Sequence, residues 1–235
     1  MKTLIRPISR TIRNIFRTIR DLLSKKSRFI RLNPFAKGKI IFFDKKKRKF
    51  FALSSRGEGD SSVLDTIFSK YCYSLKGMQR SDDIYAKYDG ILALEKRPLI
   101  IDCGSNIGAA TYFFANEFPE AKVIGVELES NNAKLASKNN LSKNNVHILH
   151  AAIGPESGSV MIENPKEDSK DSFRTKAYSG NGKGSIDMIS IPDIQNLYPD
   201  TIPFIVKIDI EGFEDELFSR NTQWMKVFYL ITLEI

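Results

Sequence analysis

The chain has 235 residues, of which 42% are hydrophobic and 11% aromatic, and its formal net charge is +8. This size and composition fit one sizeable domain with an appendage and exclude a chain that is disordered throughout. No apolar run approaches the roughly 18–20 residues that cross a bilayer, and arginines interrupt the first apolar positions, so we expect neither a membrane span nor a secretory signal. Cys72 and Cys103 form no metal-binding or disulfide pattern, which favours a reducing compartment such as the cytoplasm.

The charge is divided unequally along the chain. Residues 1–49 hold 17 Lys or Arg and two acidic residues, which gives +15, whereas residues 50–235 hold 19 basic and 26 acidic residues, which gives −7. We therefore predict a basic N-terminal arm over residues 1–59 and an acidic globular domain over residues 60–235. Because the positive charge is concentrated in the arm, it does not indicate that the globular domain binds nucleic acid.

The arm begins with a predicted amphipathic helix from about Pro7 to Leu23. Apolar side chains recur at spacings of three and four residues, which places them on one helical stripe bordered by arginines. Three uses of the stripe are open: docking on the chain's own domain, pairing with another helix, or lying on an anionic membrane surface through residues 4–32. We favour the membrane, because apolar burial and arginine attraction to anionic lipid would act together. The stripe consists of Ile5, Ile8, Ile12, Ile15, Ile19 and Leu22.

After the amphipathic helix, short apolar runs predict a hairpin within the arm and a helix at the start of the globular domain. A polar stretch from Lys25 to Arg31 closes the arm helix. Residues 39–43 and 50–53 are two apolar runs separated by a polar turn, which predicts a β-hairpin. After a glycine-containing loop at 56–60, residues 62–75 carry apolar side chains at helical spacing.

From Pro98 onward the sequence alternates between predicted strands and helices. The strands are short, continuous apolar runs, which are typical of a parallel sheet covered by helices on both faces. We therefore expect an α/β fold with a parallel core. Two further strands, at 158–163 and 186–191, flank a polar segment at 164–184 that is predicted to be a loop. The core strands are predicted at 99–101, 123–126, 146–149, 204–208 and 228–233, and the helices at about 107–117, 130–140 and 213–220.

The segment Asp102–Gly108 directly follows the first core strand and opens a helix. Its glycines let the backbone approach a ligand closely, and a helix N-terminus offers free N–H groups. The spacing D-x-G-x-x-x-G differs from the dinucleotide pattern G-x-G-x-x-G, which disfavours a pyrophosphate. Glu127 ends the next strand, where its carboxylate can accept hydrogen bonds from both hydroxyls of a ribose. Together these features favour a nucleoside without phosphate, foremost S-adenosylmethionine, over a purely structural turn.

A second acidic segment, Val206–Glu214, follows a later core strand. Asp209 and Glu211 flank one residue, so both carboxylates can point toward the cleft above the sheet. Such a pair can orient an amine, hold a divalent cation or act as a general base for a hydroxyl. The alternative is that Asp209 caps the next helix, with Gly212 in a tight turn.

These motifs resemble the FkbM family of S-adenosylmethionine-dependent methyltransferases over about residues 98–235. The matching segments are IIDCGSNIGAATYFFA, VIGVELE, HAAIG, SIPDI and, most specifically, VKIDIEGFE. The resemblance implies a Rossmann-like methyltransferase sheet. Since the sequence stops just after the fifth core strand, we expect that sheet to lack the family's last two strands. The resemblance assigns the methionine and ribose end of the cofactor to Asp102, Gly104, Asn106 and Gly108, the ribose to Glu127, the adenine border to Ala151, and the methyl-transfer site to Asp209, Glu211 and Glu234.

The implied function is O-methylation of a sugar or small-metabolite hydroxyl, on a small-molecule or glycan acceptor. Asp209 is the candidate base or orienting group, and no metal ligand is assigned. Two alternatives stay open: a non-catalytic partner protein that keeps the methyltransferase fold, and an RNA methyltransferase that grips phosphates with the arm. The acidity of the globular domain argues against nucleic acid as a partner. The expected location is cytoplasmic and, through the arm, peripheral at a membrane.

Other conspicuous residues are given structural roles. His147 and His150 have no matching cluster of acids or cysteines, so we interpret both as structural. Trp224 is expected to pack near the last strand. Lys207 lies in a buried strand, so it either extends to the strand end or pairs with a carboxylate such as Glu234. Cys103 is interpreted as a space-filling residue of the cofactor loop.

Overall fold

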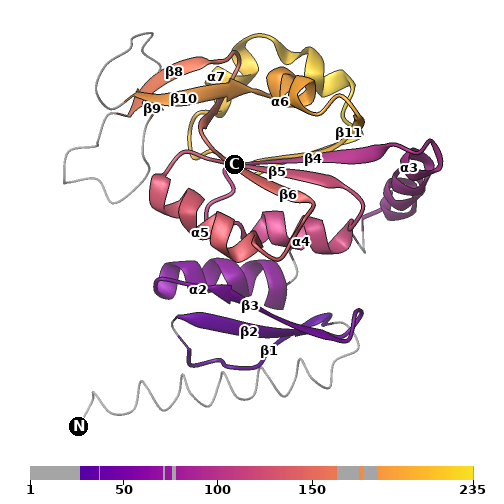
Figure 1. The fold of residues 1–235 in the computed structure, drawn as a ribbon, viewed down its shortest axis with the longest axis vertical. Helices are drawn as coiled ribbons and strands as arrows, with labels where there is room; N and C mark the ends of the chain where they lie inside the picture. The colour runs from indigo at the N-terminus through magenta and orange to yellow at the C-terminus, as the bar shows by residue number, and fades with distance from the viewer. Residues whose placement is uncertain are drawn as a thin grey trace. The chain divides into compact units, whose positions relative to one another are not determined.

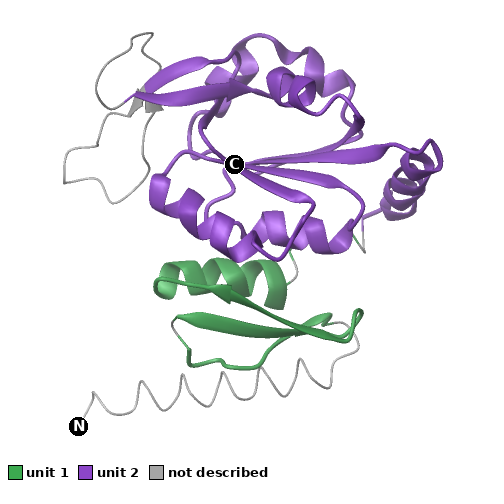
Figure 2. Ribbon diagram, in the orientation of Figure 1, with its two compact units in different colours: residues 1–75 green, residues 76–235 purple. Residues whose placement is uncertain are grey.

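A computed structural model shows the fold, and it divides the chain into two compact units, residues 1–75 and 76–235 (Figure 2). This division falls later than the predicted boundary at 59/60, because the helical segment after residue 57 packs on the N-terminal sheet. The predicted arm helix lies outside the described residues, so its uses stay predictions. The structure describes residues 27–36, 38–70, 72–75, 78–162, 175–176 and 185–234.

The first unit is a three-stranded antiparallel sheet with the order β1-β2-β3. The predicted hairpin is confirmed as β2 (Lys39–Asp44) and β3 (Lys49–Ser54). Strand β1 (Phe29–Arg31) was not predicted, because its polar neighbours suggested the end of the arm helix. The predicted helix at 62–75 is instead an α-helix followed by a turn of π-helix, and it starts and ends earlier. These two elements are α2 (Glu58–Leu64) and η1 (Asp65–Ser69).

Aromatic packing and buried ion pairs hold this unit together. The ring of Phe68 from η1 lies 5.2 Å from Phe29 and 5.1 Å from both Phe42 and Phe51, measured between ring centroids. The guanidinium of Arg28 lies 2.8 Å from the carboxylate of buried Asp44. Residues next to β1 therefore belong to the folded core and not to a separable arm.

The second unit contains a five-stranded parallel sheet with the order β12-β11-β4-β5-β6. The expectation of an α/β fold with a parallel core is confirmed. Helices α4 and α5 cover one face of the sheet and α6 and α7 cover the other (Figure 1). The strands are β4 (Arg97–Cys103), β5 (Lys122–Glu127), β6 (Val146–His150), β11 (Thr201–Ile208) and β12 (Leu230–Leu233), and the helical segments are α3 (Ser81–Ala93), α4 (Ala109–Glu117), α5 (Ser130–Asn140), α6 (Ile191–Leu197), α7 (Glu214–Ser219) and η2 (Thr222–Lys226).

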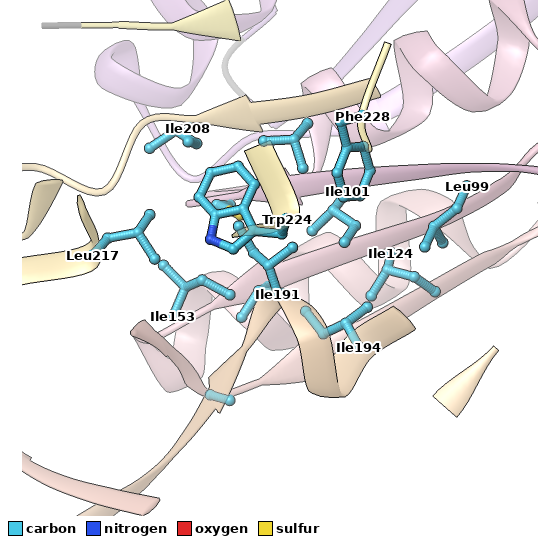
Figure 3. Close-up of a cluster of buried hydrophobic side chains, with 14 residues drawn as sticks. Leu99, Ile101, Ile124, Ile153, Ile191, Ile194, Ile208, Leu217, Trp224 and Phe228 are labelled. Atoms are coloured by element: carbon cyan, nitrogen blue, oxygen red, sulfur yellow. The ribbon is translucent and has the colours of Figure 1, made fainter. Parts of the chain in front are cut away.

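Buried apolar side chains cover each face of this sheet. On the α6/α7 face, Ile101, Ile124 and Val206 pack with Trp224, which confirms the packing role predicted for the tryptophan (Figure 3). On the α4/α5 side, helix α4 has all nine of its residues buried. Removing this much apolar surface from water stabilises the sheet whose strand ends carry the predicted site residues.

A small second sheet has the order β7-β10-β8-β9 and confirms the two additional strands predicted. Strand β7 runs parallel to β10, and β8 runs antiparallel to it. Among the described residues, no helix is long and apolar enough to cross a membrane. The strands are β7 (Ala152–Gly154), β8 (Gly158–Ile162), β9 (Thr175–Lys176) and β10 (Ser185–Ser190).

The strand order determines where a ligand can bind. From β4 the chain adds β5 and β6 on one side, and it then adds β11 and β12 on the other. The order therefore reverses between β4 and β11. In such sheets the ligand crevice lies beyond the carboxyl ends of the strands at this reversal.

Candidate functional site

The loop after β4 forms a compact turn at the strand reversal. Its backbone is left-handed at Gly104 (φ 76°), Asn106 (φ 48°) and Gly108 (φ 76°). The N–H groups of Gly104 and Ser105 both donate to the carbonyl oxygen of Val126, at 3.0 and 2.9 Å. This places the loop over the end of β5, so the predicted cofactor loop is shaped by the strand that also carries Glu127.

Helix α5 clamps the end of this loop with two buried asparagines that we did not predict. The Nδ2 groups of Asn139 and Asn140 donate to the carbonyl oxygens of Ile107 and Gly108, each at 2.9 Å. A Cβ on Gly108 would lie 2.5 Å from Nδ2 of Asn140, so glycine is required there by the packing of α4 on α5. The signal available in the sequence was a pair of amides at the end of an otherwise amphipathic helix.

Glu127 connects the three segments that border the predicted cofactor site. Its Oε2 accepts a hydrogen bond from the N–H of Asn106 at 2.7 Å, and its Oε1 accepts one from the N–H of Glu129 at 2.8 Å. Its own carbonyl oxygen accepts the N–H of Ala151 at 3.0 Å. Burial raises the pKa of Glu127 above its ordinary value, against the opposing effect of these backbone donors. The structure thus brings together three of the predicted cofactor residues.

Asp102, a further predicted cofactor residue, is fully buried under the loop. One carboxylate oxygen accepts the hydroxyl of Thr111 at 2.6 Å, and the other lies 3.1 Å from Nζ of Lys207. In this arrangement Asp102 supports the loop from below. A role in contacting the cofactor directly stays a prediction.

Lys207 joins the cofactor loop to the acidic turn after β11. Besides its ion pair with Asp102, its Nζ lies 3.2 Å from Oδ2 of Asp209 and donates to the carbonyl oxygen of Gly104 at 3.2 Å. Of the two arrangements predicted for Lys207, the pairing with carboxylates is confirmed, and the partners include Asp102 and Asp209. The strand sequence predicted its burial but not its partners.

The acidic turn continues the pairing of β11 with β4. The N–H of Asp209 donates to the carbonyl oxygen of Cys103 at 3.1 Å, so Asp209 lies beside the start of the cofactor loop. Glu211 is exposed, with a left-handed backbone at φ 50°. The carboxylate of Glu214, which we had not singled out, accepts the N–H groups of Ile210 and Gly212 at 3.2 and 2.8 Å.

These contacts bear on the alternative that Asp209 caps the next helix. Helix α7 begins at Glu214, and its N-cap residue is Phe213. Asp209 therefore lies too far before the helix to cap it. The carboxylate of Glu214 accepts the backbone N–H groups of the turn instead. The cap interpretation is wrong, and the partly exposed Asp209 carboxylate lies beside the loop after β4.

Two further predicted residues lie at the same edge of the sheet or within its loop. Glu234 follows β12, and its N–H donates to the carbonyl oxygen of Ile208 at 3.0 Å. Burial raises the pKa of the Cys103 thiol strongly, which agrees with a space-filling role. Among the residues that the structure describes, no group of three or more His, Cys, Asp or Glu side chains could hold a metal ion.

Both histidines lie on β6, and His150 is the register partner of Glu127. Nδ1 of His147 shares a hydrogen bond of 2.5 Å with the hydroxyl of Tyr198. Nε2 of His150 lies 3.1 Å from the carbonyl oxygen of Leu128. Both contacts agree with the structural roles that we predicted.

The strand order, with its reversal between β4 and β11, and the helices on both faces define an α/β protein with a Rossmann-like sheet. Residues 102–234 match the methyltransferase FkbM domain, and the chain therefore belongs to the FkbM methyltransferase family. A search of curated protein sequences finds no match. The matched residues include both the loop after β4 and the acidic turn after β11.

Proposed function

We propose that the protein is an S-adenosylmethionine-dependent methyltransferase that acts on the hydroxyl of a sugar or small metabolite. The observation that carries the proposal is the direct contact between the cofactor loop and the acidic turn. The N–H of Asp209 donates to Cys103, and Lys207 bridges Gly104 and Asp209. A carboxylate suited to an acceptor thus adjoins the loop suited to a methyl donor.

The residues present fit the nucleoside part of this cofactor. The two oxygens of an ionised carboxylate offer about four acceptor sites, and the three donors on Glu127 leave capacity for a ribose hydroxyl. Asn106 and the backbone at Ala151 would border the ribose and the adenine. The concentration of carboxylates, Glu127 with Asp102 and Asp209, supports a ligand without phosphate. When bound, the cofactor supplies a methyl group already activated on a sulfonium.

The side chain of Asp209 supports a role at the acceptor hydroxyl. Its Oδ2 is held by Lys207, and about a third of the side chain is exposed. A carboxylate fixed in this way can orient a hydroxyl and take up its proton. Glu211 and Glu234 would hold other hydroxyls of a sugar at the same edge. Because the methyl group is already activated, alignment of the two reactants would supply most of the rate enhancement.

The test is a label-transfer assay with the purified full chain. Methyl-labelled S-adenosylmethionine is added with a small-molecule extract of the source cells, and products are identified by mass spectrometry. We expect label in a hydroxyl-bearing small molecule, and none with Asp209→Asn. A parallel reaction contains total RNA of the same cells in place of the extract, and label in that RNA would establish the RNA methyltransferase. Cofactor binding without any transfer would establish the non-catalytic partner protein.

A further inference from the structure

Three charged side chains at the loop–turn contact leave one net negative charge. Lys207 contributes the positive charge, and Asp102 and Asp209 contribute two negative charges, at 3.1 and 3.2 Å from its Nζ. The side chains of Lys207 and Asp102 are 4% and 0% exposed, whereas that of Asp209 is 35% exposed. The buried pair of Lys207 and Asp102 is therefore neutral. The remaining negative charge is on the partly exposed carboxylate of Asp209.

The position of this charge matters because the cofactor loop lies against Asp209. A Cβ on Gly104 would lie 1.7 Å from the carbonyl oxygen of Asp209, so the backbones of these two residues are in direct contact. At such a partly exposed position, a unit charge several ångströms away changes the affinity for a cation by between about threefold and thirtyfold. Without Lys207, two uncompensated carboxylates would share this space, and one of them would be fully buried.

We propose that Lys207 is a specificity-determining residue: it limits the charge of this site to the one net negative charge left by Asp102 and Asp209, and that charge makes the site prefer the cationic methyl donor to its neutral product. The inference rests on the proposed function. In the transfer, the carbon–sulfur bond breaks and its electron pair stays on sulfur, the acceptor oxygen forms the new bond to the methyl group, and the hydroxyl proton passes to Asp209. The cofactor thereby loses its positive charge. Asp209 loses its negative charge in the same step, so the attraction that held the donor is absent for the product, which favours product release.

The test compares two ligands by calorimetry at pH 7.5. Sinefungin carries a charged amine in place of the methylated sulfur, and S-adenosylhomocysteine is the neutral product. We expect wild-type protein to bind sinefungin more tightly, and Asp102→Asn to lower this preference at least about threefold. Asp102 has no exposed surface, and asparagine keeps the shape of its side chain, so the substitution removes the negative charge with little change in packing.

A charge-restoring variant separates this inference from a structural role. The double variant Asp102→Asn/Lys207→Met again has one net negative charge, and we expect the wild-type preference to return. Lys207→Arg, which keeps the charge, should keep the preference as well. A preference unchanged in Asp102→Asn, or still lost in a double variant that binds S-adenosylhomocysteine normally, overturns the inference. If neither buried variant folds, the preference is measured in Asp209→Asn, whose substituted side chain is about a third exposed. An unchanged preference for sinefungin in that variant overturns the inference.

The same measurements distinguish failure of the proposed function from failure of the charge role of Lys207. If wild-type protein binds neither ligand, the proposed function itself fails. If both ligands bind with equal affinity in every variant, the methyltransferase proposal stands and the charge role of Lys207 is excluded.

Discussion

Gly104 and Asp209 approach each other so closely that no side chain fits between them. An ideal Cβ on Gly104 would lie 1.7 Å from the carbonyl oxygen of Asp209, and the φ angle of Gly104 is +76°. Two parts of the chain a hundred residues apart thus meet backbone to backbone at the carboxyl edge of the sheet. The predicted cofactor loop and the acidic turn after β11 form one unit through this contact.

The first prediction concerns this contact. Gly104→Ala should lower the free energy of unfolding by more than about 2 kcal/mol and abolish binding of S-adenosylhomocysteine, because the methyl group forces the loop away from the turn. Gly212→Ala is the matched control. Gly212 also has a left-handed backbone, at φ +95°, but an added Cβ there meets nothing within 4 Å. It should cost only about 1 kcal/mol. Equal effects in urea unfolding would show that the loop–turn contact is unimportant.

A second prediction follows from the raised pKa of Glu127. The ionised carboxylate accepts the N–H groups of Asn106 and Glu129 and, as proposed, the ribose hydroxyls. When it binds a proton it loses acceptor capacity, so affinity for S-adenosylhomocysteine should fall as the pH drops through this pKa. Because burial raises the pKa, the fall should begin above the ordinary value of 4.5 and approach about tenfold per pH unit below the pKa. Calorimetry from pH 7.5 to pH 5 measures it, and Glu127→Gln should remove the dependence. An affinity independent of pH in wild-type protein would contradict the assignment.

Asp209→Asn should affect turnover more than cofactor affinity. The amide keeps the shape of the side chain but cannot take up a proton, so kcat should fall by about a hundredfold or more, while the affinity for S-adenosylhomocysteine changes little. Glu211→Gln, on the exposed part of the same turn, should act mainly on the KM of the acceptor. A wild-type kcat in Asp209→Asn would exclude the role of base or orienting group. Repeating the assay with a chelator reports whether a divalent cation takes part.

The proposed membrane association of the arm calls for a truncation that leaves the first sheet intact. Phe29 and Ile30 lie in the core, and Arg28 pairs with Asp44, so the deletion must end at residue 26 and not at residue 32. The full chain should pellet with liposomes that contain anionic lipid, less so at high salt, and the chain without residues 1–26 should not. Equal pelleting of both chains, or of neither, would reject the membrane role.

The sequence was most informative where one strand or turn carries its own signal. Apolar runs located the core strands, and the two acidic and glycine-containing motifs located the strand ends that form the site. Helix α5 was predicted at its observed bounds, since its periodicity is complete within one segment. Such features depend on neighbours in sequence, and physical patterns of period two and 3.6 describe them well.

Contacts between distant segments were not predictable in this way. Nothing near Lys207 in the sequence shows that its ammonium meets Asp102, because the pairing depends on the register of β11 against β4. Strand β1 was missed since Arg28 and Arg31 looked like a polar terminus, and only their partners, buried Asp44 and partly buried Asp65, explain them. Tertiary partners decide whether a charged residue marks a surface or a core.

The most direct test of the account is the affinity of S-adenosylhomocysteine for two variants of neighbouring glutamates. Glu127→Ala should weaken binding at least tenfold, or about 1.4 kcal/mol, because the ribose loses its acceptor. Glu129→Ala is the control. The Glu129 carboxylate caps α5 by accepting the N–H groups of Asn131 and Asn132, so its loss should cost about 1 kcal/mol of stability and leave the affinity within about twofold. Calorimetry on folded protein should show this difference. Unchanged affinity in Glu127→Ala, or no binding by wild-type protein, would contradict the assignment of this edge of the sheet as the cofactor site.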